Sequence, residues 1–313
     1  MSLGEVDDLA SKLAKTTVEI KGVSFEGQTL RLNTEEDAKK VAEAIEKCEN
    51  MEFLNFDGNT IGVEAAKVIG KALSGKPEFK RALWNNMFSG RMKTEIPKAL
   101  EFLGDGIISS GATLTELILS DNAFGPVGLA GLETFIRSPS CHSLQILRLN
   151  NNGLGIQGAK VEGRTCCLGI LSKALLDAIE SSRKLGKQMA LKVFVAGRNR
   201  LENEGAKLLA RVFKEMKTLE ELSMPMNGIY HQGLSELTSA LSENPNLRVV
   251  DLNDNTVGGK KGAVHVAAML PQLKKLQKLN LGDCLLKTSG ALVLAQALAK
   301  GNNTALEVWL YTE

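Results

Sequence analysis

One spacing of apolar residues recurs along most of this 313-residue chain. The pattern L-x-x-L-x-L-x-x-N, with conservative replacements, starts at Leu114, Leu144, Leu219, Leu247 and Leu276, and looser copies start at Met51, Phe79 and Leu191. Most copies follow one another after about 28 residues, and a unit of that length cannot bury its apolar face alone. The copies must therefore stack side by side, and an aromatic content of only 4% also favours stacked repeats over a barrel or sandwich.

Each copy predicts a strand followed by a helix. The leucines point inward from a short strand, and the asparagine side chain hydrogen-bonds backbone groups where the chain leaves it. Apolar residues at helical spacing follow over residues 62–73, 204–213, 232–241, 261–270 and 289–298. This is the pattern of a leucine-rich repeat, and its long helical part predicts the ribonuclease-inhibitor-like horseshoe. That α/β solenoid has a parallel sheet on its concave side and helices on its convex side.

The repeats leave no room for a linker, so we expect one domain over residues 1–313. Its parts are an N-terminal half-repeat or cap (1–50), the repeats (51–305), an insertion (161–169) and a truncated final repeat (306–313). In the cap we expect a helix over about residues 5–15, a strand at 30–32 and a helix opened by a capping pattern at Thr34. An uncapped final repeat would expose an apolar face and favour self-association.

Composition excludes several kinds of partner and cofactor. The 38 basic and 36 acidic residues are scattered and give a net charge of +2, which favours neither nucleic acid nor an anionic membrane. No apolar stretch is long enough to span a membrane. Five cysteines without a C-x-x-C pair and three distant histidines argue against a disulfide framework and against a metal site.

The chain also lacks a nucleophile elbow, a complete P-loop and a metal-ligand helix, so we expect no active site of its own. Function is then expected on exposed residues where the strands end. Those loops contain Arg91, Lys93, Arg198 and Arg200, together with Asp121, Asp254 and Asp283. For each arginine the alternative is a solvated charge without a role.

Six segments, in order, read GNTIGVEAA, FSGRMKTEIPKAL, LSDNAFGP, LNNNGLG, VFVAGRNRLEN and LNDNT. In sequence and spacing they resemble the Ran GTPase-activating protein family over about residues 24–298. The repeat does not require GRNRLEN or FSGRMKTEIP, which makes the resemblance specific. It implies that the partner is the small GTPase Ran in its GTP form, that GTP and Mg are bound by Ran, and that this chain needs no cofactor. It also implies a cytoplasmic protein, with a site at the nuclear envelope as a second location, that supports nucleocytoplasmic transport.

The resemblance also implies roles for individual residues. In this family an asparagine at a strand exit is understood to help fix the catalytic Gln and the switch region of the GTPase, and the matching residue is Asn151. The resemblance gives docking or orienting roles to Arg91, Lys93, Arg198 and Arg200. From their loop positions alone, we also expect Asp121, Asp254 and Asp283 to face basic Ran surface. The alternative mechanism uses Arg91 as an arginine finger.

The sequence differs from the family at two places, and it leaves one alternative function open. Residues 161–169 look inserted before an otherwise familiar helix over 170–181, and the chain stops at 306–313, where the family continues into further repeats and an acidic tail. The alternative function is a non-catalytic leucine-rich-repeat scaffold or inhibitor. Ribonuclease inhibitors look acidic and rich in cysteine, whereas this chain has a net charge of +2 and five cysteines.

Overall fold

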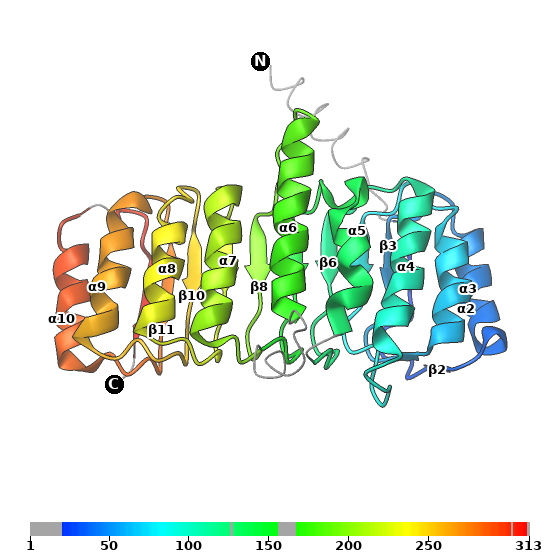
Figure 1. Cartoon of the computed structure of the whole chain (residues 1–313), viewed down its shortest axis with the longest axis horizontal. Coiled ribbons are helices and arrows are strands. Elements are labelled where there is room, and N and C mark those ends of the chain that lie inside the picture. Colours follow the sequence, from blue (N-terminus) through cyan, green and yellow to red (C-terminus); the bar gives the residue numbers. More distant parts are fainter. Residues whose placement is uncertain (1–20, 126–127, 156–166, 302, 312–313) are drawn as a thin grey trace, which may run out of the picture.

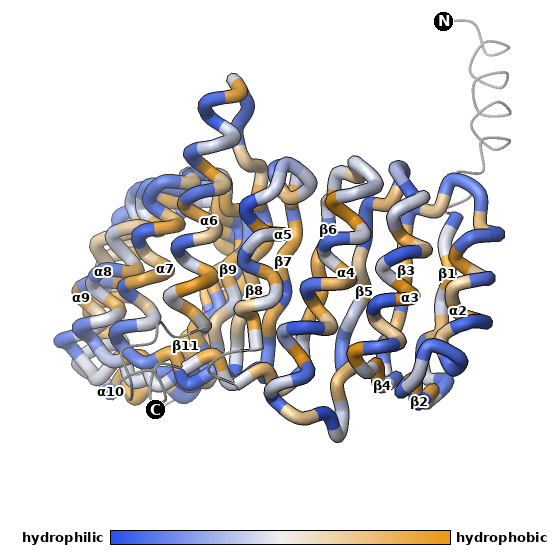
Figure 2. The backbone as a smooth tube through the Cα atoms, turned by 45° about the vertical axis from the view of Figure 1, so that its right-hand side comes forward, coloured by the Kyte–Doolittle hydropathy of each residue, from blue (hydrophilic) through white to orange (hydrophobic). Residues whose placement is uncertain are grey.

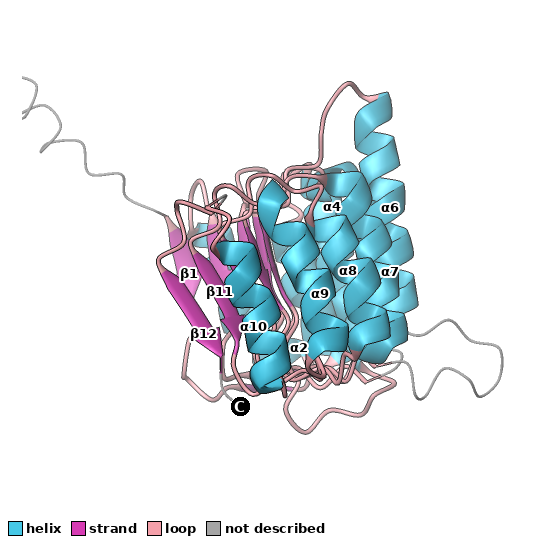
Figure 3. Ribbon diagram, turned by 90° about the vertical axis from the view of Figure 1, so that its left-hand side faces the viewer, coloured by secondary structure: helices cyan, strands magenta, loops and turns pink. Residues whose placement is uncertain are grey.

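The computed structural model describes residues 21–125, 128–155, 167–301 and 303–311, which form two layers. One layer is a ten-stranded sheet, and the other is a row of helices packed along one face of it (Figure 3). All neighbouring strands of the large sheet are parallel and follow the order of the chain. Figure 1 shows the same order in the helices, from α2 at one end to α10 at the other. The predicted leucine-rich-repeat solenoid is therefore confirmed.

The large sheet consists of β1 (Gly22–Ser24), β3 (Phe53–Asn55), β5 (Arg81–Leu83), β6 (Glu116–Ile118), β7 (Ile146–Arg148), β8 (Val193–Val195), β9 (Glu221–Ser223), β10 (Val249–Asp251), β11 (Lys278–Leu281) and β12 (Val308–Tyr311). A two-stranded sheet pairs β2 (Arg31–Leu32) with β4 (Thr60–Ile61). The helices are α2 (Glu35–Lys47), α3 (Val63–Leu73), α4 (Ile96–Ser110), α5 (Glu133–Arg137), α6 (Cys167–Lys184), α7 (Glu202–Met216), α8 (His231–Leu241), α9 (Lys260–Met269) and α10 (Lys287–Leu298). Short 3-10 helices cover Gly128–Leu132, Pro139–Cys141 and Leu270–Gln272. None of the described helices is long and apolar enough to cross a membrane.

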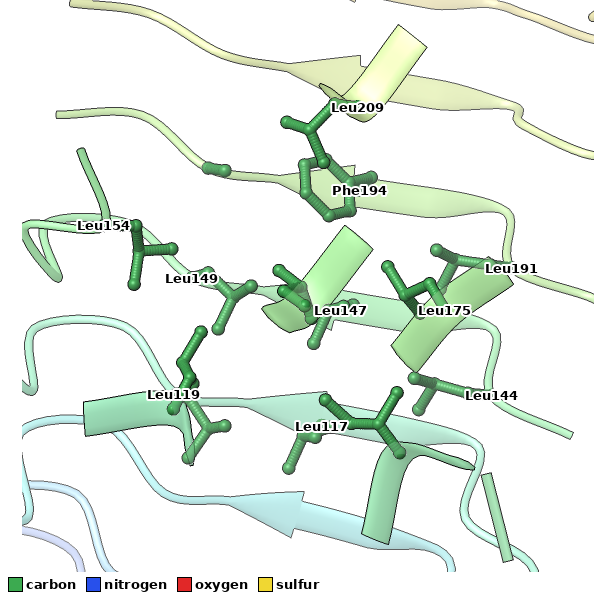
Figure 4. Close-up of a cluster of buried hydrophobic side chains, with 14 of the residues drawn as sticks. Leu117, Leu119, Leu144, Leu147, Leu149, Leu154, Leu175, Leu191, Phe194 and Leu209 are labelled. Atoms are coloured by element: carbon green, nitrogen blue, oxygen red, sulfur yellow. The ribbon is translucent and has the colours of Figure 1, made fainter. Parts of the chain in front are cut away.

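The core lies between the two layers and is built from the motif leucines. Strand register places Leu117 opposite Leu147, and Leu147 opposite Phe194, so equivalent motif positions stack from repeat to repeat. Figure 4 shows these side chains with Leu175 and Leu209, which reach them from α6 and α7. In Figure 2, hydrophobic and hydrophilic stretches alternate along the helices, as expected when one face of each helix is buried. Stacking thus buries a continuous core that no single repeat could form.

The motif asparagines form a second continuous structure, which we call the asparagine ladder. Its members are Asn122, Asn152, Asn199, Asn227 and Asn255, all buried. The Oδ1 atom of Asn152 accepts a hydrogen bond from the backbone N–H of Asn122 at 2.8 Å, and Asn199 Oδ1 accepts from the N–H of Asn152 at 2.9 Å. The Nδ2 atoms donate to backbone carbonyls, as Asn152 does to Leu119 at 2.8 Å. The predicted structural role of these asparagines is confirmed.

The N-terminal end differs from the prediction. The strand expected at residues 30–32 exists as β2, but it pairs with β4 at the side, and the first strand of the large sheet is β1. Its motif lacks leucine, and Phe25 instead stacks on Phe56 with ring centroids 5.7 Å apart. Thr34 caps α2 as predicted, through a reciprocal capping box with Asp37. The helix expected over residues 5–15 and residues 161–166 of the insertion lie outside the described residues, whereas the helix expected at 170 already begins at Cys167.

Candidate partner-binding site

The residue directly before the last motif position, where five repeats have a ladder asparagine, has an unusual backbone. Seven residues at this place adopt the left-handed conformation with φ between 42° and 61°: Asn86, Asp121, Asn151, Arg198, Met226, Asp254 and Asp283. We call them the edge row, because they are all exposed and follow the ends of successive strands of the large sheet. Each of these side chains is exposed, while the residue that follows it is buried.

Backbone hydrogen bonds hold the edge row in place. The N–H of Asn151 donates to the Gly197 carbonyl at 2.9 Å, and the N–H of Arg198 donates to the Pro225 carbonyl, also at 2.9 Å. A left-handed conformation costs roughly 1–2 kcal/mol for a residue with a Cβ atom. The bonds between repeats offset that cost, so the exposed side chains are presented from a fixed backbone.

A hollow of about 430 Å³, which we call the edge hollow, lies between the exit loops of β5, β6, β7 and β8. It is lined by Lys93, Ala123, Gly125, Asn151, Asn152, Gly153, Gly155, Arg198, Asn199 and Arg200. Four residues predicted from the sequence thus meet in one place: Asn151, Lys93, Arg198 and Arg200.

The small residues of the edge hollow have a steric role that the sequence prediction missed. A Cβ atom added to Gly155 would lie 2.5 Å from the carbonyl oxygen of Arg200, so the loop that follows the ladder residue Asn152 can approach the neighbouring exit loop only with glycine. The side chain of Lys93 lies beside Gly125, where an added Cβ would be 3.7 Å from its Cδ atom. In the sequence, the glycines of two consecutive exit loops, Gly125 and Gly155, could have indicated that these loops approach their neighbours closely.

Three consecutive asparagines follow β7, and each has a different environment. Asn150 Oδ1 accepts a hydrogen bond from the N–H of Gly197 at 2.6 Å, and Asn152 belongs to the ladder. The side chain of Asn151 is exposed, and its Nδ2 atom donates to Asp121 Oδ1 at 2.9 Å. Of the three side chains, that of Asn151 is the most exposed.

The three cations of the edge hollow have exposed side chains. Lys93, Arg198 and Arg200 form no ion pair with any residue that the structure describes. The Arg198 Nε atom lies 3.3 Å from the sulfur of Met226, the next member of the edge row. A concentration of positive charge around Asn151 favours an acidic partner surface.

Arg91 does not line the edge hollow. Its guanidinium is partly buried and donates to Thr60 Oγ1 at 3.0 Å and to the carbonyls of Leu32 at 3.1 Å and Thr60 at 3.3 Å. It borders a separate hollow of about 520 Å³, which includes Arg31. In this arrangement Arg91 attaches the long exit loop of β5 to the two-stranded sheet.

The remaining predicted residues lie along the edge row. Asp121 contacts Asn151 directly, as described above. Asp254 and Asp283 belong to the exit loops of β10 and β11, and the N–H of Asp254 donates to the Gly282 carbonyl at 2.8 Å. They are adjacent in the row but do not line the edge hollow.

Possible metal ligands and two cysteines can be assessed in the described part of the chain. The described part of the chain contains no group of three or more His, Cys, Asp or Glu residues that could hold a metal ion. Cys141 and Cys284 are buried, and burial raises the pKa of both thiols, that of Cys284 to about 11. Both cysteines therefore act as packing residues.

Comparison with known proteins agrees with this architecture. A family model described as a leucine-rich repeat matches residues 112–132 and 243–260. Together with the parallel sheet, the convex helices and the asparagine ladder, the match defines a leucine-rich-repeat solenoid of the ribonuclease-inhibitor-like class.

The chain is, more narrowly, a homologue of the Ran GTPase-activating proteins. It is 50% identical to Ran GTPase-activating protein 1 of Xenopus laevis over 73% of this chain, and 47% identical to the Ran GTPase-activating protein of Drosophila melanogaster over 73%. It is 32% identical to Ran GTPase-activating protein 1 of Saccharomyces cerevisiae, over 86% of this chain and 64% of that protein. The aligned region spans 38% of the Xenopus protein and 37% of the Drosophila protein.

Proposed function

We propose that this chain activates GTP hydrolysis by the small GTPase Ran. The observation that carries the proposal is the edge hollow, where Asn151 lies among three cations that form no ion pair with the described residues, in a chain 50% identical to a protein named for this activity. The chain would supply no active site of its own and would act on the active site of Ran. The relatives named above do not favour the alternative, a non-catalytic scaffold or inhibitor.

The proposed mechanism is preorganisation. Intrinsic hydrolysis by such GTPases is slow because the attacking water and the Gln that orients it are poorly ordered. Lys93, Arg198 and Arg200 would bind acidic groups around the GTP site, and the amide of Asn151 would hold the Gln side chain and the switch region. Because the edge row has a fixed backbone, little ordering is required at the moment of reaction.

Arg91 fits this mechanism as a loop-positioning residue better than as an arginine finger. A finger would have to leave three acceptors, two of them backbone carbonyls, before reaching the GTP. Its docking role would be indirect, because it holds the loop that also contains Lys93. Asp254 and Asp283 would extend the contact along the edge row toward basic surface of Ran.

The partner and the location of the activity follow from the same proposed function. The partner is Ran in its GTP form, which brings GTP and Mg, so the chain needs no cofactor. We place this activity in the cytoplasm, with the nuclear envelope as a second location, where hydrolysis by Ran would support nucleocytoplasmic transport.

Phosphate release from Ran·GTP in single-turnover assays tests the proposal. We expect the wild-type chain to accelerate release, and Asn151→Ala to lower the rate at saturating protein by about 10²- to 10³-fold, as for removal of one preorganised polar group. Asn86→Ala is the matched control, because Asn86 is an exposed asparagine of the edge row that borders the other hollow. No acceleration by the wild-type chain would refute the function, and a normal rate for Asn151→Ala would refute the role of this residue.

A further inference from the structure

We infer that Asp121 is a positioning residue that fixes which side of the Asn151 amide faces the partner, an inference that rests on the proposed function. The two residues occupy equivalent edge-row positions after the paired strands β6 and β7. Asn151 Nδ2 donates to Asp121 Oδ1 at 2.9 Å, and both side chains are exposed. The pair is therefore a contact between two neighbouring repeats on the surface that would meet Ran.

The chemistry of the two groups determines the orientation. A carboxylate has no proton to donate, whereas an amide has a donor NH2 on one side and an acceptor oxygen on the other. Only the NH2 group can face Asp121, since the flipped amide would place its oxygen against a negatively charged oxygen. The Oδ1 atom of Asn151 must then point away from Asp121, and no group in the described part of the chain donates to it.

This orientation predicts what Asn151 can hold. An exposed oxygen accepts, so the partner group must be a donor, such as the side-chain NH2 of a Gln. A Gln that is held by its NH2 group keeps its side-chain oxygen free to bind the attacking water. That water must be ordered for hydrolysis. A flipped Asn151 would instead bind the Gln oxygen and withdraw it from the water.

The backbone lets this orientation be tested without loss of the fold. Both residues have left-handed backbones, with φ of 61° for Asp121 and 52° for Asn151. Their N–H groups donate to the carbonyls of Asn150 and Gly197, each at 2.9 Å, and these bonds do not involve the side chains. An exposed hydrogen bond of this kind contributes little to stability, so loss of the Asp121 carboxylate should leave the solenoid intact.

A double-mutant cycle separates positioning from direct contact with Ran. We expect Asp121→Ala to lower the saturated rate of Ran·GTP hydrolysis by about 10- to 100-fold, as for a small misplacement of a reacting group. In an Asn151→Ala background the same change should cause no further loss, because its effect passes through Asn151. Asp121→Asn should recover most of the rate, since it keeps an acceptor oxygen and tolerates the left-handed backbone. Asp105→Ala, on the convex helix α4, is the control for loss of one exposed carboxylate.

The side-chain NH2 signals of Asn151 in NMR spectra of the unbound chain provide a readout without Ran. In Asp121→Ala we expect one of the two protons to shift upfield and to exchange faster with water, because it loses its acceptor. Unchanged signals would overturn the inference about Asp121, whether or not the wild-type chain activates Ran. Failure of the wild-type chain to activate Ran would refute only the proposed function. A wild-type saturated rate for Asp121→Ala, a change confined to apparent affinity, or an equal loss in both backgrounds would also overturn it.

Discussion

The asparagine ladder can be broken at its second member by Asn152→Ala. Asn152 is fully buried, and the variant leaves the N–H of Asn122 without the oxygen that it meets at 2.8 Å. An unsatisfied buried donor costs about 1–3 kcal/mol. The Leu119 carbonyl loses one of its two amide donors but keeps Asn122 Nδ2 at 2.9 Å, so this loss adds about 1 kcal/mol at most. We therefore expect the free energy of unfolding to fall by about 1–4 kcal/mol.

Denaturant unfolding followed by circular dichroism measures this loss, and hydrogen exchange locates it. Asn151→Gly is the comparison, because it removes a neighbouring exposed amide from a left-handed position that glycine adopts without strain, and we expect a change below about 1 kcal/mol. Amide protection should fall in the repeats on both sides of Asn152 and remain high elsewhere. Equal stability of the two variants, or a larger loss in Asn151→Gly, would refute the assignment of Asn152 to the ladder and Asn151 to the surface.

Two further predictions concern Arg91 and His142. We expect Arg91→Ala to weaken the apparent affinity for Ran while saturating protein restores most of the hydrolysis rate, and a loss of about 10³-fold or more at saturation would instead support an arginine finger. His142 is buried, and burial, followed by the nearby charge of Lys187, lowers its pKa from the ordinary value of 6.5. Below about pH 6.5 the His142 imidazole binds a proton in the unfolded chain more readily than in the folded chain. The free energy of unfolding should therefore fall as the pH drops below about 6.5. His142→Gln should have a smaller loss of unfolding free energy between pH 7.5 and 5, and an identical slope in the variant would contradict this cause.

The repeat architecture could be predicted from the sequence because its determinants are local. Each motif leucine and asparagine lies within one short segment, and the register of the parallel strands follows from stacking equivalent positions. The first strand was missed because Val23 and Phe25 occupy places where other repeats have leucine. In that repeat half-buried Val23 and Phe25 pack against the core in place of leucine.

The candidate site was predictable residue by residue but not as an arrangement. The resemblance named Asn151, Arg198 and Arg200, and the structure places them around one hollow. The inward turn of Arg91 depends on carbonyls more than 30 residues earlier in the chain, so no local pattern encodes it. The bond between Asn151 and Asp121 likewise joins residues 30 positions apart and requires both loops to have the same left-handed geometry.

The division between ladder and edge row has a consequence for how such a surface can change during evolution or by design. Within each exit loop, one residue carries the stability and its neighbour carries the chemistry presented outward. The edge row already includes amide, carboxylate, guanidinium and thioether groups on nearly the same backbone. A substitution in the edge row changes the group presented at one position of the surface. The hydrogen bonds of the asparagine ladder and of the backbone remain. The side chains of the edge row can therefore be exchanged independently of the fold. A few substitutions in the row could specify a new partner while the scaffold stays the same.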